Sequence, residues 1–343
     1  MLRKLITLIF ALQVLMVDAS AANPRSPETQ ALLDYLKEIQ GKQSLSGVMA
    51  NVNWNTLEAQ WVYTHTGRWP AINCFDFIHH MSSQPGGWID YSNTQIVIDW
   101  HAAGGIVAAM WHWNVPARES GKYAFYSSDT DFDVRKIFDP TSSEYALMLR
   151  DIDQIAAYLK PLKEKNIPVI WRPLHEAGGK WFWWGRDAEA CKRLWVLMYE
   201  RFQSAGLDNL LWVFTPASAW QQPLSEGFKW YPGNEYVDIV GYDIYNVDKA
   251  TSCYEDYYLL LHRHCPDKLV ALTECGSIAS ISAQWQAGAK WLFFMPWYDH
   301  KRTNNPTSSE FQQSTHTNAD VDWWHDAWSQ PYVLSRDQVS YFR

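Results

Sequence analysis

The sequence predicts a single α/β domain with the architecture of a (β/α)8 TIM barrel, and three observations support this prediction. Short runs of β-branched and aromatic residues alternate with amphipathic segments along almost the whole chain. These runs are nearly all apolar, which is the pattern of strands buried on both faces of a parallel sheet. There are eight of them, and a barrel of this kind takes about 250 residues, which fits a chain of 343.

An open, doubly wound sheet is the alternative architecture. That fold would favour a glycine-rich nucleotide loop after the first strand, and the residues at 46–50 read Ser-Gly-Val-Met-Ala instead. No Pro/Gly/Ser-rich linker, charge block or internal repeat divides the chain. We therefore expect residues 22–343 to form one large domain.

Strands and helices can be assigned in chain order. The expected strands are residues 45–49, 71–75, 105–111, 169–172, 210–214, 239–242, 270–273 and 291–295. The expected helices are residues 27–39, 56–65, 94–103, 142–164, 187–205, 254–263, 278–287 and 321–328. The clearest helix is 142–164, because its apolar residues recur at three- and four-residue steps behind a serine cap. Residues 220–236 are only weakly helical.

The N-terminus has the pattern of a secretory signal peptide over residues 1–21. Arg3 and Lys4 precede an apolar run at 5–17, and Ala19-Ser20-Ala21 is a small-x-small cleavage site. The run is shorter than the ~20 residues that a spanning helix needs. We therefore expect a secreted protein, extracellular or periplasmic, with no membrane association after cleavage.

Charge and cysteine content restrict the possible partners. The net charge of −8 argues against nucleic acid or an anionic membrane and favours a neutral substrate. Five cysteines lack any CxxC or Cys/His ligand spacing, so they do not indicate a metal site. We expect no metal ion and no organic cofactor. Cys253 and Cys265 lie at the ends of one expected helix, ~18 Å apart and too far to pair. We expect a monomer.

Tryptophan is the most unusual feature of the composition, at 21 of 343 residues. Half or more of these rings are expected to pack in the core. Others can line a groove, because an indole stacks on the C–H face of a sugar while its N–H binds a hydroxyl. The clusters at 111–113 (Trp-His-Trp) and 181–184 (Trp-Phe-Trp-Trp) follow expected strands, and this position favours the groove.

Two glutamates follow expected strands four and seven, at the rim where a barrel places its catalytic groups. Glu176 ends Trp-Arg-Pro-Leu-His-Glu (171–176), and Glu274 lies within Leu-Thr-Glu-Cys-Gly (272–276). Paired carboxylates are what glycosidic bond cleavage requires, and a spacing of about 5–5.5 Å retains anomeric configuration. The alternatives are that Glu176 only pairs with Arg172, and that Glu274 only caps a helix near Ile278.

The local sequence suggests which glutamate does what. Glu274 sits on a strand end with little room to move, which suits a nucleophile. Glu176 leads into an Ala-Gly-Gly turn that we expect to be open, which suits an acid/base group. Hydrogen-bond donors are needed to keep the nucleophile ionised, and the candidates are Arg172, His175 and Tyr245.

Several polar residues have simpler explanations. Asp243 and Tyr245 face one side of an extended segment, where strand-end capping is an alternative to a role in the site. The Asp-Thr-Asp-Phe-Asp run at 129–133 lacks the glycine and distal glutamate of an EF-hand and is expected to be a solvated loop. The histidines at 79–80 and 262–264 are expected at the surface or in loops.

The motifs together resemble glycoside hydrolase family 26, whose main activity is β-mannanase. They are Trp-Arg-Pro-Leu-His-Glu (171–176), Trp-Phe-Trp-Trp-Gly (181–185), Gly-Tyr-Asp-Ile-Tyr (241–245) and Thr-Glu (273–274). Many related retaining hydrolases have asparagine before the acid/base glutamate. This chain has His175 at that position, and in this feature it resembles family 26. The resemblance covers about residues 46–297.

The resemblance implies a role for each matching residue. Glu176 would be the acid/base and Glu274 the nucleophile, with Tyr245 hydrogen-bonded to the latter. The remaining implied substrate-binding residues are His175 and Arg172 around Glu274, Asp243 nearby, Trp181 next to the scissile bond, and Trp111 and Trp297 in the pocket of the cleaved sugar.

The expected function is that of a secreted retaining endo-β-1,4-mannanase (mannan endo-1,4-β-mannosidase) that cleaves mannan, glucomannan or galactomannan by double displacement. Within the same family, a β-1,3-xylanase, a mixed-linkage β-glucanase or an exo-acting, mannobiose-releasing mannanase remains open. In a different class, the chain would be a noncatalytic polysaccharide-binding barrel.

Overall fold

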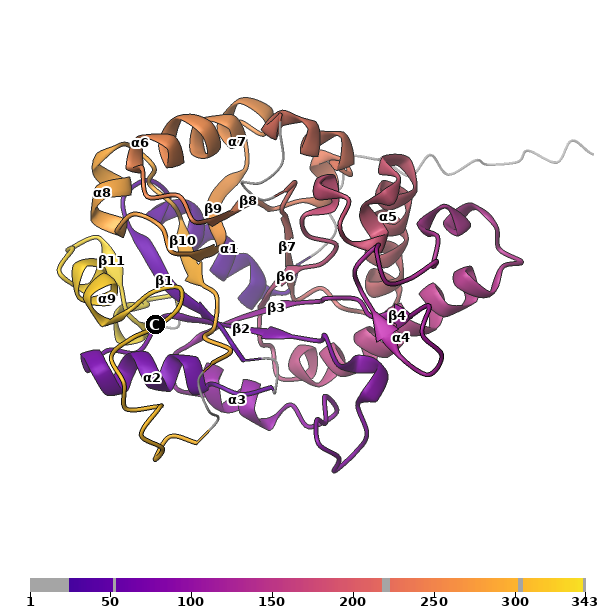
Figure 1. Ribbon diagram of the computed structural model, residues 1–343, viewed down its shortest axis with the longest axis horizontal. Helices are drawn as coiled ribbons and strands as arrows, with labels where there is room; N and C mark the ends of the chain where they lie inside the picture. Colours follow the sequence, from indigo (N-terminus) through magenta and orange to yellow (C-terminus); the bar gives the residue numbers. More distant parts are fainter. Residues whose placement is uncertain (1–24, 52–53, 218–222, 302–304, 342–343) are drawn as a thin grey trace, which may run out of the picture.

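The computed structural model describes residues 25–51, 54–217, 223–301 and 305–341, and it shows a closed parallel barrel with helices around it (Figure 1). The expected signal peptide therefore lies outside the described residues. The barrel strands are β1 (Ser44–Met49), β2 (Ile72–Asp76), β3 (Ile106–Met110), β6 (Val169–Arg172), β7 (Leu210–Phe214), β8 (Ile239–Tyr245), β9 (Leu269–Gly276) and β10 (Phe293–Pro296).

Barrel closure comes from β10 pairing with β1, and every neighbouring pair of the eight strands is parallel. A short strand, β11 (Val333–Leu334), also pairs in parallel with the start of β1. After β3, a small antiparallel hairpin of β4 (Val115–Pro116) and β5 (Tyr123–Ala124) leaves the barrel. The predicted fold class is confirmed.

Helices connect most of the strands. They are α1 (Pro27–Ile39), α2 (Leu57–Thr66), α3 (Gln95–Ala102), α4 (Ser143–Glu164), α5 (Ala188–Ser204), α6 (Ala250–Ser252), α7 (Leu259–His264), α8 (Ile281–Gln286) and α9 (Val321–Trp328). A π-helical turn at Cys253–Tyr258 joins α6 to α7, so this helical segment begins earlier than predicted. Residues 224–236 form short 3-10 turns.

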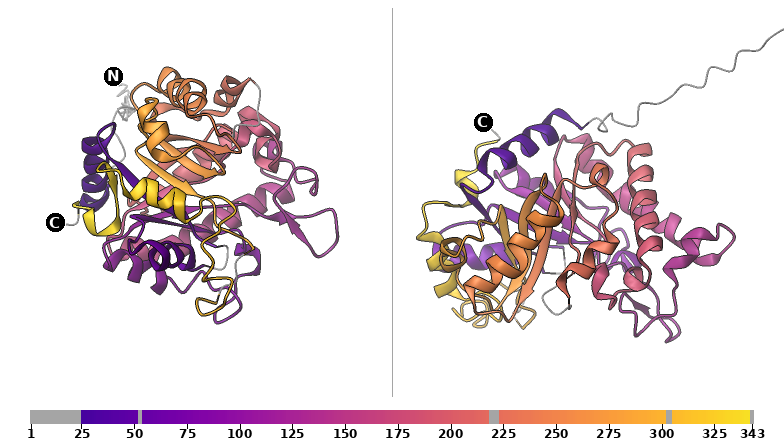
Figure 2. Two further views of the ribbon diagram at one scale, coloured as in Figure 1. Left: turned by 60° about the vertical axis from the view of Figure 1, so that its left-hand side comes forward. Right: turned by 90° about the horizontal axis from the view of Figure 1, so that it is seen from above.

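The side chains of the strands separate into two clusters according to strand alternation. One lies inside the barrel, where Leu45, Ile72 and Leu211 meet Leu32 and Leu36 of α1. Because these residues lie near the strand starts, α1 covers that end of the barrel. Figure 2 shows the C-terminal segment passing beside α1, where the Tyr341 and Tyr35 ring centroids are 5.9 Å apart.

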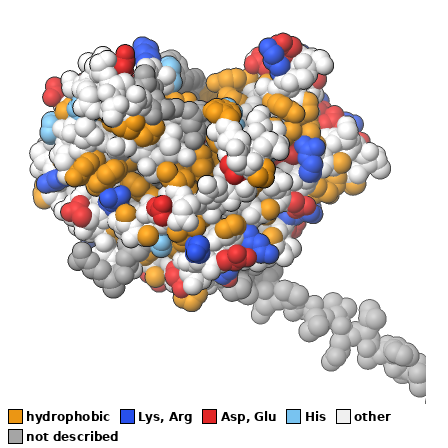
Figure 3. Space-filling model, turned by 90° about the horizontal axis from the view of Figure 1, so that it is seen from below, with side chains coloured by type: hydrophobic (Ala, Val, Ile, Leu, Met, Phe, Trp, Pro, Cys, Tyr) orange, Lys and Arg blue, Asp and Glu red, His pale blue; other side chains and the backbone are white. Residues whose placement is uncertain are grey.

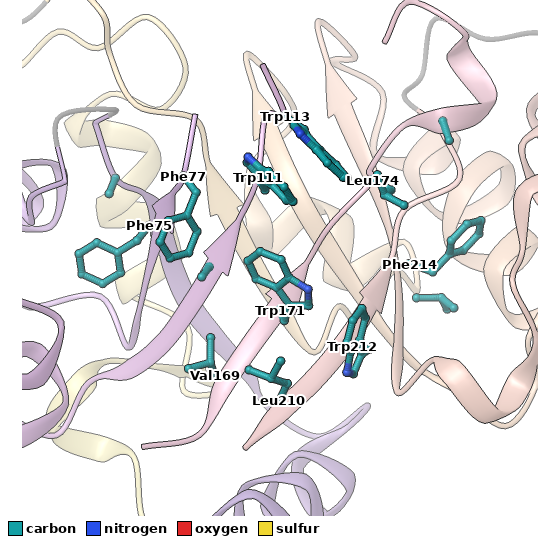
Figure 4. Packing of buried hydrophobic residues seen from close by; sticks show 14 of the residues in the cluster. Phe75, Phe77, Trp111, Trp113, Val169, Trp171, Leu174, Leu210, Trp212 and Phe214 are labelled. Atoms are coloured by element: carbon teal, nitrogen blue, oxygen red, sulfur yellow. The ribbon is translucent and has the colours of Figure 1, made fainter. Parts of the chain in front are cut away.

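The second cluster lies between the barrel and its helices, and it contains most of the large aromatic side chains. Figure 4 shows Val169 and Trp171 of β6 on this outer face, alongside Trp212 and Phe214 of β7. Among the described residues thirteen tryptophans are buried, out of 21 in the sequence, which confirms that at least half serve packing. All five cysteines are buried free thiols. Within the described ranges, no helix has the length and apolarity to cross a membrane.

Candidate active site

Arg172 joins the carboxylates of two neighbouring strands at the C-terminal end of the barrel. It is the last residue of β6 and points inward, and its side chain is almost fully buried. Its Nη1 donates to Asp243 Oδ2 at 3.1 Å, and its Nη2 forms a short ion pair with Glu274 Oε1. The simple Arg172–Glu176 pair is therefore wrong, because this guanidinium is directed across the barrel to β8 and β9.

A β-bulge in β9 turns Glu274 toward the barrel axis. Tyr242 pairs with Leu272 and Asp243 pairs with Glu274, so Thr273 is an extra residue opposite β8. The pairing with β10 shifts over the same stretch, which places the irregularity in β9 itself. Regular alternation would send Thr273 inward and Glu274 outward, whereas the bulge lets both face the interior.

Gly241 of β8 makes room for this bulge. A Cβ atom at this position would lie 2.2 Å from Thr273 Cγ2 and 2.6 Å from its Oγ1. The Thr273 hydroxyl donates to Asp243 Oδ1 at 2.7 Å and lies 3.2 Å from Thr215 Oγ1. The extra residue is thus locked into the polar network beneath Glu274.

Tyr245, the last residue of β8, donates its hydroxyl to Glu274 Oε2 at 2.8 Å. Burial and the charges of Asp243 and Glu176 raise the pKa of Tyr245 well above its usual value, so the phenol keeps its proton. Glu274 therefore accepts from a guanidinium and a phenol, both of which stabilise an ionised carboxylate. The helix-cap alternative for Glu274 is wrong, because Ser280 caps α8.

Glu176 lies on the segment that follows β6 and has a left-handed backbone conformation, with φ of 53°. This conformation is uncommon for residues other than glycine and often marks functional sites. Its N–H donates to Thr215 O at 2.9 Å, and the Gly178 N–H donates to Pro216 O at 2.9 Å. The turn after Glu176 was expected to be open, but these bonds close it against the end of β7.

The environment of Glu176 favours a protonated carboxyl. Burial raises its pKa well above the ordinary value, and the charge of Asp243 and a hydrogen bond with it raise the pKa further. The Arg172 charge and the Trp181 N–H act in the opposite direction. Because Arg172 binds Asp243 and Glu274, the two glutamates are connected through one compact charge network.

Trp181 is half-buried and donates its Nε1–H to Glu176 Oε2 at 2.9 Å. Its ring lies over Gly179, where a Cβ would approach the indole to 2.1 Å, so a glycine is required there. Trp181 is therefore the ring of the 181–184 cluster that lies beside the carboxyl. Trp183 and Trp184 are fully buried, which corrects the expectation that this whole cluster lines a groove.

His175 points toward another histidine rather than toward Glu274. Its Nε2 lies 3.2 Å from Nε2 of His112, and His112 Nδ1 lies 2.7 Å from Asp76 Oδ2. Burial, Arg172 and His112 lower the pKa of His175 well below its usual value, so this ring is neutral. Its proposed role as a donor to the nucleophile is therefore wrong, while Arg172 and Tyr245 do contact Glu274.

Trp111 does not line the barrel mouth. Only 1 % of its surface is exposed, and its ring stacks on Trp113 at a 4.0 Å centroid distance in the outer cluster (Figure 4). Alternation beyond β3 places Met110 and His112 on the inner side, so Trp111 and Trp113 must face outward. Trp111 therefore does not reach the mouth of the barrel, contrary to its expected place in the pocket of the cleaved sugar.

Trp297 follows β10 directly, and its N–H donates to Cys275 O at 2.8 Å. The indole is half-buried, and its ring centroid lies 5.7 Å from that of His112. Trp297 and His112 therefore lie side by side at the mouth. His112 and Asp76 were not predicted from the sequence, although strand alternation beyond β3 would have selected His112.

Other polar side chains have structural roles. His80 lies in the loop after β2, and it is buried, with Nδ1 accepting from Trp111 at 3.2 Å and Nε2 lying 3.2 Å from Asp151. The 129–133 segment is a loop held by Arg118 and Arg186. Across the described part of the chain, no three His, Cys, Asp or Glu side chains are arranged to hold a metal ion.

The chain is similar to known proteins over most of its length. The model of glycosyl hydrolase family 26 matches residues 21–327. The chain is 35% identical over 336 residues to a mannan endo-1,4-β-mannosidase of Thermothelomyces thermophilus, covering 94% of this chain and 64% of that protein. It is 32% identical to mannan endo-1,4-β-mannosidase A of a Piromyces species, covering 95% of this chain and 51% of that protein. The chain thus spans about half to two thirds of the length of these curated relatives.

Solved structures show the same fold. The family 26 domain of a Prevotella bryantii endo-β-mannanase/endo-β-glucanase has a TM-score of 0.81 and 33% identity, covering 94% of this chain and 98% of that one. A Podospora anserina β-(1,4)-mannanase has a TM-score of 0.76 and 32% identity, covering 93% of this chain and 68% of that one. The resemblance found in the sequence motifs is confirmed.

Proposed function

Because this chain belongs to glycosyl hydrolase family 26, we propose that it is a retaining endo-β-1,4-mannanase acting on mannan, glucomannan and galactomannan. One observation carries the proposal: Glu274 accepts from both Arg172 and Tyr245, while Glu176, linked to it through Asp243, has a pKa raised well above normal. Two carboxyls with opposite protonation preferences on one rim are the requirement for glycosidic bond cleavage.

In the first step, Glu176 gives its proton to the glycosidic oxygen while Glu274 attacks the anomeric carbon. The bond from that carbon to the leaving oxygen breaks, and a covalent glycosyl–enzyme forms. In the second step, the Glu176 carboxylate takes a proton from water, whose oxygen attacks the same carbon and releases Glu274. Two inversions give net retention.

The remaining residues hold the reacting groups or the sugar. Arg172 and Tyr245 keep Glu274 ionised and directed at the anomeric carbon. Trp181 positions Glu176 through its N–H and offers its ring to the sugar on the leaving side. His112 and Trp297 border the pocket of the cleaved sugar, and His175 holds His112 in place.

Product stereochemistry tests the mechanism. Proton NMR during hydrolysis of mannohexaose is expected to show the β-anomer first, because the linkage cleaved is β. Early appearance of the α-anomer would contradict retention. Product sizes separate endo from exo action, since endo cleavage yields mixed oligosaccharides and exo action yields mannobiose alone.

Substitutions test the roles of the two glutamates. Glu274→Ala is expected to abolish hydrolysis and to leave oligosaccharide binding nearly intact, whereas ordinary turnover by this variant would rule out the nucleophile assignment. Glu176→Ala is expected to lose far more activity on mannan than on an aryl mannobioside with a good leaving group. Equal loss on both substrates would contradict an acid/base role.

A panel of β-mannans, β-1,3-xylan and mixed-linkage β-glucan tests the choice of sugar. Reducing-sugar release from mannans and little from the others is expected. Release from β-1,3-xylan or β-glucan alone would select those activities, and binding without any turnover would select a noncatalytic barrel. We also propose that the protein is secreted, on the basis of the leader pattern at residues 1–21, and that it is a monomer. N-terminal sequencing of exported material and sedimentation velocity test these points.

A further inference from the structure

Trp88 is the most exposed large apolar side chain in the described part of the structure, with 67% of its surface accessible. It lies on the loop between β2 and α3, at the barrel end that also carries Glu176 and Glu274. One side of the indole is held by His79, whose ring centroid lies 4.7 Å away at 63°. The ring is therefore supported in a defined position while much of it faces solvent.

A cavity of about 380 Å³ opens beside this ring. Two indoles line it, Trp54 and Trp88, together with polar side chains of the same loop and of the first turns of α3. These polar side chains are Asp90, Asn93, Gln95 and Asp99. The lining contains carboxylates and amides but no Lys, Arg or His. This chemistry suits a neutral, hydroxyl-rich ligand and disfavours an anionic one.

One wall of the cavity, Trp54, packs against the outer face of the end of β2. The Trp54 ring packs on Phe75 and Phe77, each at a 5.0 Å centroid distance. Between these two residues lies Asp76, which accepts from the His112 backbone at 3.1 Å and pairs with its ring at 2.7 Å. Figure 3 shows one face of the molecule on which apolar side chains are widespread, with charged ones scattered among them.

We propose that Trp88, with Trp54 and the polar side chains between them, forms a distal subsite for the β-1,4-linked hexose chain whose cleaved end lies at Glu274. This inference rests on the proposed function, because it assigns a further binding position to the same polysaccharide. The exposed indole stacks on the C–H face of a sugar ring several units from the scissile bond, and the amides and carboxylates bind its hydroxyls.

A distal subsite makes a prediction that depends on substrate length. Trp88→Ala is expected to lower kcat/KM on mannohexaose and on mannan by about threefold to tenfold. It is expected to leave kcat/KM on the shortest hydrolysed oligosaccharide unchanged, because that substrate does not reach the ring. Trp88→Phe keeps an aromatic face and is expected to retain most of the activity on long substrates.

Phe138→Ala is the matched control, because Phe138 is also an exposed aromatic residue, at 60%, but does not line the cavity. It is expected to change neither long nor short substrates. Thermal unfolding of all variants shows that the folds are intact. In the Glu274→Ala background, calorimetric titration with mannohexaose is expected to show the same loss of affinity for Trp88→Ala.

Two results would overturn the subsite: unchanged kcat/KM on mannohexaose, or an equal loss on substrates of every length. Self-association that Trp88→Ala abolishes, without any effect dependent on substrate length, would assign the ring to a second copy of the chain instead. Failure of the wild-type protein on every mannan would refute the proposed function. Normal hydrolysis by the wild-type protein, together with an unchanged kcat/KM of Trp88→Ala on mannohexaose, would refute the distal subsite alone.

Discussion

Replacement of Gly241 by alanine tests whether the β9 bulge positions Glu274. The new Cβ would lie 2.2 Å from Thr273 Cγ2, while ordinary contacts begin at 3.4 Å. Thr273 must therefore retreat by 3.4 − 2.2 = 1.2 Å, or the two strands must separate by a similar amount. Because Thr273 immediately precedes Glu274 in the bulge, the carboxylate is expected to move with it.

The expected cost has two separate parts. Overpacking of this kind destabilises a folded protein by about 1–3 kcal/mol. A misplacement of about 1 Å in a reacting group lowers the rate by about 10²-fold. We therefore expect Gly241→Ala to stay folded, with a modestly lower free energy of unfolding, and to lose about a hundredfold in kcat on mannohexaose.

Gly47→Ala provides the matched control. Gly47 is a strand glycine of β1, and its Cβ would meet Met295 Cγ at 2.7 Å, away from Glu274. Urea unfolding measures stability, and initial rates on mannohexaose measure kcat and KM. Gly47→Ala is expected to lose comparable stability with little change in kcat. Thr273→Ala removes the closest atoms, so adding Gly241→Ala to this variant is expected to lower kcat by much less than it does in the wild-type protein.

A folded Gly241→Ala variant with wild-type kcat would refute the reasoning. So would an equal loss of kcat in Gly47→Ala, because the effect would then come from general loosening of the barrel. A crystal structure of Gly241→Ala in which Glu274 has not moved would show that displacement of this carboxylate does not cause the rate loss.

Three further variants test individual contacts. Trp181→Phe removes the N–H that stabilises ionised Glu176, so the pKa of this acid is expected to rise. The basic limb of the kcat/KM–pH profile is then expected to move to higher pH. A shift to lower pH would contradict the contact. Tyr245→Phe removes one hydrogen bond to ionised Glu274, worth about 1.5–3 kcal/mol, and is expected to lower kcat roughly 10- to 100-fold, whereas an unchanged kcat would refute its role. Trp111→Phe is expected to lower the melting temperature and leave KM for mannohexaose unchanged, and a raised KM with unchanged stability would restore Trp111 to the pocket.

Much of the fold could be predicted because its signals are local. The runs at 169–172 and 210–214 match β6 and β7 residue for residue, since a buried parallel strand is apolar on both faces. The helix at Pro27–Ile39 begins with a serine cap and proline, and its observed bounds equal the predicted ones. The predicted start at 278 was wrong because Ser280, three residues before Ala283, supplies the cap for α8.

The site was predictable where strand order alone decides it. The loop after β6 and the strand β9 bring Glu176 and Glu274 to one rim, because all barrel strands run parallel. Successive side chains along a barrel strand face alternately into and out of the barrel. This alternation was not applied to Trp111, whose neighbour His112 faces the mouth.

The sequence by itself determined the barrel, the strand ends that bear carboxylates and the family, because each depends on residue types at fixed spacing along the chain. Only the tertiary structure decided that Arg172 binds Glu274 and Asp243 rather than Glu176, and that β9 carries an extra residue. A bulge appears only when a strand is laid against its neighbours. The partner of a buried charge likewise depends on which oxygen lies nearest once the ring of strands has closed.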